Sequence, residues 1–365
     1  MKRICHLTYH RPFDTRIFHK ECKTLAKAGY DVCLLVPHSR KETVDGVEII
    51  PLPKYRTRFK RFLFLPFKTF LLALKQKAQV YHFHDPAFII TGIFLKIMGK
   101  KVVYDVHEDY KSKLLSKFYI PPYIRKPIAL LFDCFEKLAA KFFDAIIVVE
   151  DYIYQRFKHH RKVQIANFPP VLSIPRNKKD YSRFVFVYAG GISKERGILK
   201  ILSALEYLQD YKDRIKIVLL GPCEDNEVKE KMVKNETVVS YLGYRPWSEV
   251  MTTYSSADAG LLLLQPVQSY ITVETPVKLF EYMLAGLPVI SSNFIGLKKF
   301  IEENKCGICV DPTNPKEIAE AMKYLVEHPE EAREMGENGR KAVVEKYNWE
   351  REGEKLIKLY KELMG

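Results

Sequence analysis

The chain of 365 residues exceeds the ~250–300 residues at which a single hydrophobic core stops growing, so its length predicts two domains. An apolar fraction of 47% and a charged fraction of 28% are typical of a folded globular protein and exclude an intrinsically disordered chain. The net charge of +15 indicates anionic partners or an anionic surface.

Short β-rich runs alternate with amphipathic stretches in the first half of the chain, which predicts βαβ units and a parallel sheet. The chain starts with a strand and polar residues instead of an apolar export signal, so we expect a cytoplasmic protein. Residues 15–29 have the pattern of a helix that stops at Gly29. The predicted strands are 3–8, 31–37, 47–52, 80–84, 101–106, 144–150 and 162–167.

Two stretches of this half carry many cations among apolar and aromatic residues. Residues 54–77 hold eight Lys or Arg and no acid, and residues 110–126 add five more. This mixture favours an anionic membrane surface, where each cation contributes about 1 kcal/mol of attraction. A solvated basic face and nucleic-acid binding are the alternatives, but no nucleic-acid recognition motif is present. We expect a peripheral protein on the inner face of a membrane, because no stretch reaches the ~18 uncharged apolar residues of a membrane span.

A proline-rich stretch without periodicity follows Asn167 and indicates a linker, after which the alternation of strands and helices begins again. We expect domains at 1–168 and 183–348, a linker at 169–182, and a charged terminal helix at 349–365. The predicted strands of the second half are 184–191, 215–221, 237–243, 259–264, 287–292 and 307–312. The fold class is therefore α/β, with two doubly wound Rossmann-like domains facing each other across a cleft and ligands at the carboxyl ends of the strands.

The segment 274–290, "ETPVKLFEYMLAGLPVI", predicts a helix that starts at Pro276 after an N-cap at Thr275 and stops at Gly286. Most of its positions are apolar, but one narrow stripe along the helix is not. The stripe consists of Lys278, Glu281, Tyr282 and Ala285.

Two interpretations fit the pair Lys278 and Glu281. A surface ion pair three residues apart would contribute only a few tenths of a kcal/mol. Alternatively, the free N–H groups and the positive dipole at the helix start form an anion site that Lys278 strengthens. Glu281, one turn deeper, could then accept two hydrogen bonds from a ribose diol, so that the helix would bind a nucleotide.

The cysteines and histidines suggest no metal centre. Seven cysteines, an odd number in a long chain, predict reduced thiols. Cys306 and Cys309 form one CxxC without a second pair, so we expect buried small side chains there. The sequence "HFHD" places His82 and His84 on one face of a strand, and a metal at this pair is the less favoured alternative. We expect no metal and no cofactor.

With these motifs, the chain resembles the family-4 (group 1) retaining glycosyltransferases of the GT-B fold, and the resemblance spans nearly all of it. It implies an N-terminal acceptor domain, a C-terminal donor domain, and a C-terminal helix that packs back on the N-terminal domain. The motifs that carry the resemblance are found in 14–32, 81–86, 102–110, 166–170, 188–198, 239–246, 276–290 and 347–360.

The resemblance implies that Glu281 binds the hydroxyls of the donor ribose. Lys278 and the amides of Pro276, Val277 and Lys278 would lie near the donor diphosphate. Tyr244 corresponds to the loop that flanks the nucleobase, and His107 to the histidine that reaches the transferred sugar and the β-phosphate.

The chain departs from the family pattern at three places. Glu274 lies seven positions before Glu281, where the usual first glutamate lies eight before it. Gly190 and Gly191 stand where many members have Gly-Arg. The Gly-Gly loop of the first domain is replaced by "YHRPFDTR".

We expect other residues of this chain to fill the roles of the missing family residues. The pair Arg196 and Gly197 replaces a Lys-Gly pair, and Lys194 or Arg196 covers for the missing arginine. His10 and Arg16 are acceptor-side candidates. Asp14 is a further candidate on that side, with capping of the following helix as the stronger alternative.

The sequence thus predicts a glycosyltransferase that moves a hexose from a nucleotide-diphosphate sugar to a saccharide or lipid-linked acceptor with retention and without a metal. Polysaccharide, lipopolysaccharide or glycolipid synthesis is the expected setting. Lys278, Arg196 and a helix N-terminus would stabilise the leaving group. The alternatives are a nucleotide-sugar epimerase of the same fold and a nucleic-acid binder. A dehydrogenase is disfavoured because no G-x-G-x-x-G follows the first strand.

Overall fold

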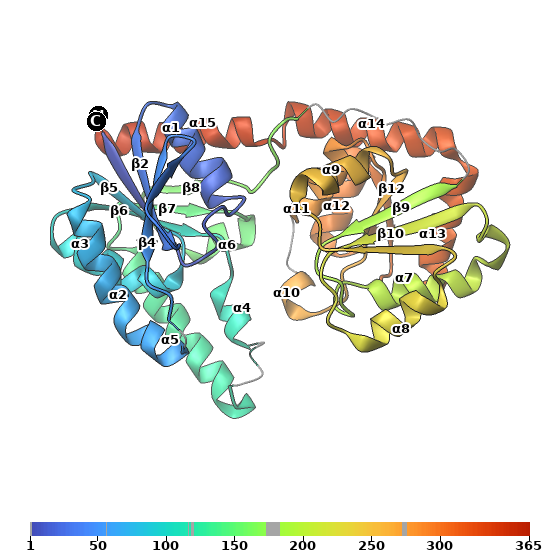
Figure 1. Cartoon of the computed structure of the whole chain (residues 1–365), viewed down its shortest axis with the longest axis horizontal. Helices are drawn as coiled ribbons and strands as arrows, with labels where there is room; N and C mark the ends of the chain where they lie inside the picture. Colours follow the sequence, from blue (N-terminus) through green and yellow to red (C-terminus); the bar gives the residue numbers. More distant parts are fainter. Residues whose placement is uncertain (1, 56, 116, 118–119, 173–182, 272–275) are drawn as a thin grey trace. The chain divides into compact units, whose positions relative to one another are not determined.

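The computed structural model describes the chain except residues 1, 56, 116, 118–119, 173–182 and 272–275. The chain divides into two compact units, which are described separately (Figure 1). Unit 1 comprises Met1–Asn167 and Trp349–Gly365, and unit 2 comprises Phe168–Asn348. Most of the predicted linker, residues 173–182, lies outside the described residues.

Unit 1 contains an eight-stranded sheet in the order β3-β4-β2-β1-β5-β6-β7-β8. All neighbouring strands are parallel except β3 and β4, which pair antiparallel at the edge. The sequence analysis missed β3, which has only three residues. The strands are β1 Arg3–Leu7, β2 Asp31–Pro37, β3 Glu42–Val44, β4 Val47–Leu52, β5 Val80–Phe83, β6 Lys101–Val106, β7 Ala145–Val148 and β8 Lys162–Gln164.

Helices cover both faces of this sheet. Figure 1 shows α1 and α15 on one face and α2, α3 and α5 on the other, and a separate buried apolar cluster lies under each group. The helices of unit 1 are η1 Ile17–Cys22, a π-helix, α1 Lys23–Lys27, α2 Arg58–Lys75, η2 Pro86–Phe88, α3 Ile89–Ile97, α4 Tyr110–Leu115, α5 Pro122–Ala140, α6 Asp151–Arg156 and α15 Trp349–Met364.

The C-terminal helix α15 belongs to unit 1 because its apolar stripe packs there. Leu356, Leu359 and Tyr360 are buried in the same cluster as η1 and the β1–β2 strands. The Trp349 indole Nε1–H donates to the Thr24 hydroxyl over 2.8 Å. These contacts bring the last residues of the chain to its first sheet.

Unit 2 contains a six-stranded, all-parallel sheet in the order β11-β10-β9-β12-β13-β14. Its strands are β9 Phe184–Ala189, β10 Ile215–Leu220, β11 Val239–Gly243, β12 Ala259–Leu262, β13 Val289–Ser292 and β14 Gly307–Val310. Its helices are α7 Ile198–Ala204, η3 Leu205–Tyr207, η4 Gln209–Tyr211, α8 Asn226–Lys234, α9 Trp247–Ser255, α10 Gln268–Ile271, α11 Val277–Leu284, α12 Ile295–Asn304, α13 Pro315–Glu327 and α14 Pro329–Glu345.

Both units are doubly wound parallel α/β folds, as the sequence predicts. In each sheet the first strand lies in the interior and the strand order reverses beside it, between β1 and β5 in unit 1 and between β9 and β12 in unit 2. Ligands of such sheets bind beyond the carboxyl ends of the strands at this reversal. The topology therefore directs the search for a site to the residues after β1, β5, β9 and β12.

Within the described residues, no helix combines the length and the apolar composition needed to span a lipid bilayer.

Candidate functional site

The predicted helix of the 274–290 segment is α11, which starts one residue later than expected. Pro276 takes the N-cap position with extended backbone, and Gly286 follows the helix with φ 73°. The amide of Leu279 already donates to the Pro276 carbonyl over 2.9 Å. Because proline has no N–H, the expected Pro276 amide does not exist, and the first N–H groups of the helix belong to Val277 and Lys278.

The polar stripe of α11 is narrower than the sequence indicates. Tyr282 is fully buried and Ala285 is 4% exposed, so neither belongs to it. The Tyr282 hydroxyl donates to the Leu261 carbonyl over 3.3 Å, and its ring packs against Gly260. Lys278 and Glu281 remain partly exposed on the helix.

Lys278 lies in a tight cradle at the end of β9. Its Nζ donates to the Tyr188 hydroxyl over 3.1 Å and lies 4.6 Å from the centre of that ring. The Tyr188 hydroxyl in turn donates to the Gly191 carbonyl over 2.9 Å. A Cβ on Gly190 would lie 2.2 Å from the Lys278 Nζ, and Gly190 has φ 141°, so glycine is required at this position.

The charge of Lys278 is destabilised in the ligand-free chain. Burial, and next the charge of Arg196, lower the pKa of Lys278 to about 7, although Glu281 opposes this shift. Arg196 stacks on the Tyr270 ring, with 4.6 Å between guanidinium carbon and ring centre. No carboxylate within the described part of the chain pairs with Arg196. Lys278 and Arg196 are thus two basic groups close enough for the charge of Arg196 to lower the pKa of Lys278.

Position 197, next to Arg196 in the chain, accepts only glycine. It has φ 80°, and a Cβ there would lie 1.9 Å from the Leu263 carbonyl oxygen, at the end of β12. Gly197 therefore closes the first turn of α7 against the neighbouring strand, and it holds Arg196 at the point where the strand order reverses.

Lys194 and Gly191 are placed further out. Lys194 is exposed and its ammonium group pairs with Glu227, with Asp225 3.8 Å away. Gly191 is exposed, and a Cβ there would meet no atom within 4 Å. Of the two candidates for the missing arginine, Arg196 is the one whose charge acts on Lys278.

Glu281 has a partner that the sequence analysis missed. The Trp247 indole Nε1–H, at the start of α9, donates to Glu281 Oε1 over 2.9 Å. Tyr244 lies three residues before Trp247, after Gly243, and is 66% exposed. Trp247 is 41% exposed and thus provides a flat aromatic surface next to a hydrogen-bond acceptor. Glu274, the other carboxylate candidate, lies outside the described residues.

The first-domain candidates lie beyond the ends of β1, β5 and β6. His107 follows β6, and its Nδ1 is buried, 3.8 Å from Asp105 Oδ2 and without a hydrogen-bond partner. Burial lowers the pKa of His107, although the neighbouring Asp105 opposes this. The ring of His10 lies 5.3 Å from the His107 ring. These two imidazoles form one group at the strand ends.

His10 forms a charged pair that the sequence did not reveal. Its Nε2 lies 3.3 Å from Asp85 Oδ1, and this hydrogen bond raises the pKa of His10. Burial alone would raise the pKa of Asp85, but the contact with His10 and the amide of Tyr9 hold it at about 2. His10 therefore carries a positive charge more readily than an ordinary histidine does.

Arg16 is not placed as an acceptor contact. It is 4% exposed, and its Nε and Nη2 donate to Asp105 over 2.9 and 3.1 Å while its Nη1 donates to the Ile165 carbonyl. Because the guanidinium is fully engaged in the interior, Arg16 is a structural cation, which corrects the expectation. Asp14 Oδ1 accepts the amides of Arg16 and Ile17 over 2.9 and 3.0 Å, so Asp14 caps the helix η1.

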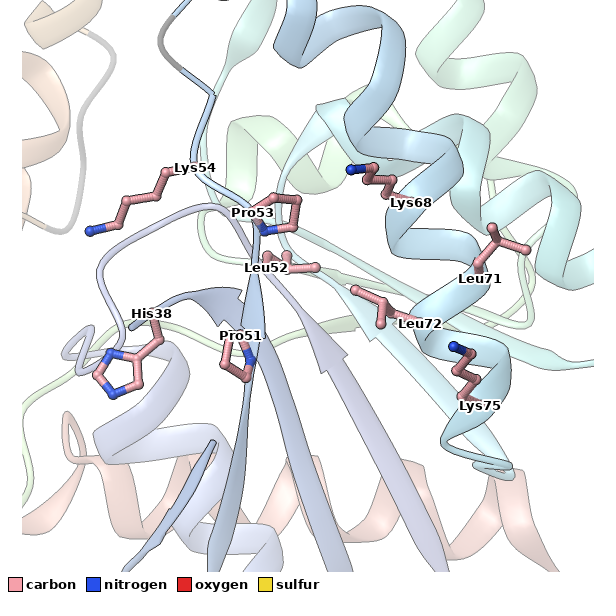
Figure 2. A pocket seen from close by; sticks show the side chains of 9 residues that line it. All are labelled: His38, Pro51, Leu52, Pro53, Lys54, Lys68, Leu71, Leu72 and Lys75. Carbon is pink, nitrogen blue, oxygen red and sulfur yellow. The ribbon is translucent and has the colours of Figure 1, made fainter. Parts of the chain in front are cut away.

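A concave surface of unit 1 lies where β4 leads into α2 (Figure 2). It is open and has a volume of about 640 Å³. Three lysines and several apolar residues line it, and no carboxylate does. None of the three lysines has an ion-pair partner within the described residues. The lining residues are His38, Pro51, Leu52, Pro53, Lys54, Lys68, Leu71, Leu72 and Lys75.

Comparisons with known proteins agree with this arrangement. Residues 173–342 match the family "Glycosyl transferases group 1", and residues 15–167 match "Glycosyltransferase Family 4". The chain belongs to the group 1 glycosyltransferases. The two matched regions together span most of both units.

Similar proteins of known sequence include the spore coat protein SA of Bacillus subtilis, 25% identical over 49% of this chain and 49% of the relative. An uncharacterised glycosyltransferase of Methanocaldococcus jannaschii is 23% identical over 74% of this chain and 70% of its own length. The alpha-D-kanosaminyltransferase of Streptomyces kanamyceticus is 24% identical over 50% of this chain and 46% of its own length. The chain thus spans about half the length of several of these relatives.

Solved structures show the same fold over the whole chain. Sucrose-phosphate synthase from Thermosynechococcus elongatus matches with a TM-score of 0.76 at 19% identity, covering 100% of this chain and 99% of the other. WaaG, a glycosyltransferase involved in lipopolysaccharide biosynthesis, matches with a TM-score of 0.72 at 15% identity, covering 98% and 99%. The fold of this glycosyltransferase is therefore GT-B.

Proposed function

We propose that this glycosyltransferase moves a hexose from a nucleotide-diphosphate sugar to a saccharide or lipid-linked acceptor, with retention of the anomeric configuration and without a metal in the reaction. The observation that carries the proposal is the cationic cradle of Lys278 at the start of α11, with Glu281 one turn further. Polysaccharide, lipopolysaccharide or glycolipid synthesis is the setting we propose.

The cradle suits a diphosphate leaving group. When the glycosidic bond of the donor breaks, negative charge develops on the departing phosphate oxygen, and fixed positive groups lower the energy of that state. Lys278, Arg196 and the first N–H groups of the helix, those of Val277 and Lys278, supply such groups. Burial first, and repulsion by Arg196 second, lower the pKa of Lys278. A bound diphosphate would relieve that repulsion.

Glu281 suits the ribose of the same nucleotide. It lies three residues after Lys278, a rise of ~4.5 Å along the helix, so one ligand can reach both side chains. Its Oε1 is held by the Trp247 indole, which leaves the carboxylate able to accept hydroxyl donors in a fixed orientation. Tyr244, three residues before Trp247, is exposed, and we propose that it flanks the base.

Unit 1 supplies the remaining group for the reaction. We assign His107 to the transferred sugar and the β-phosphate, and His10 with Asp85 to the acceptor side. In a front-face displacement, the acceptor hydroxyl attacks the anomeric carbon, the bond to the diphosphate breaks, and the departing phosphate oxygen takes the hydroxyl proton. This scheme requires no protein nucleophile.

The test begins with donors. A panel of nucleotide sugars is screened by thermal shift, since a ligand that binds the folded chain raises its apparent stability. Glu281→Ala is expected to abolish the shift of the cognate donor. Glu302→Ala, which removes an exposed glutamate on α12, is the matched control and should leave the shift unchanged.

Product analysis tests the reaction itself. The anomeric configuration of the product, read by NMR coupling constants, should equal that of the donor, and an inverted product would refute retention. Formation of an epimer from donor alone, without acceptor, would support the epimerase alternative. Full donor turnover by a folded Glu281→Ala variant would contradict the assignment of α11 as the donor helix.

We further propose that unit 1 attaches to the inner face of an anionic membrane through α2, α3 and α5. These helices lie together on one face of the first sheet (Figure 1). They also expose many large apolar side chains. Lipid tails would cover this apolar surface, and the lysines of the adjoining pocket would bind acidic headgroups. The exposed residues include Phe64, Phe67, Leu71, Phe94, Ile97, Leu131 and Leu138.

Vesicle co-sedimentation tests this attachment. The chain should bind vesicles of phosphatidylglycerol and phosphatidylcholine and should bind pure phosphatidylcholine much less. The double variant Phe67→Ser and Leu71→Ser should weaken binding, whereas Val233→Ser, which replaces an equally exposed residue of unit 2, should not. Equal binding of the double variant would refute this surface, and preferential binding of duplex DNA would favour the nucleic-acid alternative.

A further inference from the structure

We propose that unit 1 contains a structural transition-metal site, of the zinc class, formed by His6, Glu21, His82 and His84. The four side chains come from β1, η1 and the end of β5, at the place where the strand order of the first sheet reverses. The reaction proposed above does not use them, because a substrate cannot reach side chains that are at most 1% exposed.

The backbone brings these residues together by simple rules. His6 and His82 are direct partners in the parallel pairing of β1 and β5. His84 lies two residues after His82 and so points to the same face. The π-helix η1 packs over that face and places Glu21 above the three imidazoles. Widened π-turns of this kind are frequent at functional sites.

The geometry is close to that of a four-coordinate metal. One possible ligand atom from each side chain lies within 4.8 Å of all the others. The His6 Nδ1 lies 3.0 Å from the His84 Nε2, and Glu21 Oε2 lies 3.8 Å from His82 Nδ1 and 3.9 Å from His84 Nε2. Ligands at zinc distances of 2.0–2.1 Å in a tetrahedron are about 3.3–3.4 Å apart, a value that these separations bracket.

The protein partners do not satisfy this cluster. Within the described residues neither oxygen of Glu21 has a hydrogen bond, although both are buried. The nearest cation to Glu21 is Arg16, 3.0 Å away, and two hydrogen bonds already direct that guanidinium to Asp105. A buried carboxylate is costly unless cations compensate its charge, and a bound metal ion would add to the compensation that Arg16 provides.

The surroundings of His84 are those of a metal-binding histidine. Its Nδ1–H donates to Asp105 Oδ2 over 3.0 Å, which directs the Nε2 lone pair into the cluster. A carboxylate on the far nitrogen is the usual partner of an imidazole that binds zinc. Without a metal ion, the Nδ1–H of His6 donates a hydrogen bond to this Nε2 atom of His84. If His6 Nδ1 binds a metal ion, the proton of the His6 ring must therefore move to Nε2.

The ligand set selects the ion. Three imidazoles and one carboxylate suit zinc and the neighbouring first-row metals rather than calcium or magnesium, which prefer oxygen ligands. Four protein ligands leave no open position for a substrate, as in structural zinc sites. His82 Nδ1 lies 2.8 Å from the Tyr360 hydroxyl on α15, so the hydroxyl must turn away when the ion binds. The ion would tie β1, β5 and η1 together.

The experiment measures the metal content of the tag-free, full-length chain grown with added zinc. Mass spectrometry of the desalted protein should give about one zinc per chain. Glu21→Gln and His6→Gln should lower this content severalfold. His19→Gln, an exposed histidine on the same helix η1 as Glu21, is the matched control and should retain it.

Cobalt provides a readout that does not depend on the stability of those variants. The chain refolded with Co²⁺ should show the visible absorption of a four-coordinate ion. A His6→Cys variant should add a thiolate-to-cobalt band in the near ultraviolet that the parent chain lacks. Less than a tenth of an equivalent of zinc in the parent chain, an octahedral cobalt spectrum, or equal metal content in parent and variants would each overturn the proposal.

Discussion

Lys278 gives a quantitative prediction for donor binding. The pKa of about 7 in the free chain means that Lys278 is about nine-tenths charged at pH 6 and about one-tenth charged at pH 8. A diphosphate binds the charged form and raises this pKa, so binding takes up a proton. The dissociation constant of the cognate donor should therefore be nearly constant below pH 7 and rise about tenfold between pH 6 and pH 8.

Titration calorimetry measures this dependence with an intact nucleotide sugar. The experiment is repeated in two buffers of different ionisation enthalpy, which should report an uptake of about half a proton at pH 7. Lys278→Met should bind more weakly and lose this dependence on pH. If the variant retains the tenfold change, another group titrates and the assignment of Lys278 is wrong. A parent affinity that does not change with pH would refute the cationic cradle.

Four further outcomes follow from the same contacts. Trp247→Phe removes a hydrogen bond to a charged group, so calorimetry should show donor affinity about tenfold lower. Gly190→Ala places a Cβ 2.2 Å from the Lys278 Nζ and should abolish the thermal shift by donor, whereas Gly191→Ala, which meets open space, should have a much smaller effect. Folding lowers the pKa of Lys278 from its ordinary value of 10.5, so at neutral pH the unfolded chain binds more protons than the folded chain. Lys278→Met should therefore raise the free energy of unfolding, measured by denaturant titration at pH 7. This gain in stability should shrink as the pH rises toward 10. Trp349→Ala removes a buried indole that ties α15 to Thr24 and should cost about 3–5 kcal/mol of stability, measured by urea unfolding.

The sequence predicted the fold well because its strands have a strong local signal. Each expected strand exists, since runs such as 32–37 and 217–221 are apolar throughout and both faces of a parallel sheet are buried. The strand β3 was missed because three residues at an antiparallel edge carry almost no periodicity. Local patterns thus predicted thirteen strands, but they did not predict β3, which is a strand only because it pairs with β4.

The candidate site was predictable only where one segment holds several of its residues. Lys278 and Glu281 share a helix, so their spacing placed them on one side. Tyr282 has the same spacing but is buried, because Gly260 on the neighbouring strand leaves room for its ring. Trp247 comes from another helix, and no local pattern could connect it to Glu281.

The buried polar residues of unit 1 could not be predicted from the sequence. Arg16 lies at the start of the helix predicted for 15–29 and was expected on the acceptor side, yet its guanidinium is buried against Asp105, 89 residues away. Glu21 has the sequence context of an amphipathic helix, and nothing near it in the chain reveals the three histidines beneath it. Long-range pairing of β1, β5 and β6 decides both positions, so a single sequence carries no local signal for them.

The point where the strand order reverses is surrounded by different side chains in the two units. In unit 2, the reversal beside β9 holds Lys278 and Arg196, cations without a carboxylate partner within the described residues, as expected of a place that awaits an anion. In unit 1, the reversal beside β1 is filled by buried side chains such as His6 and Glu21, so no ligand of substrate size can enter there. The acceptor surface of unit 1 must then lie further out along the strand ends, where His10 is partly exposed. Buried side chains thus fill this position in unit 1 but not in unit 2, and this difference supports the donor site that we propose in unit 2.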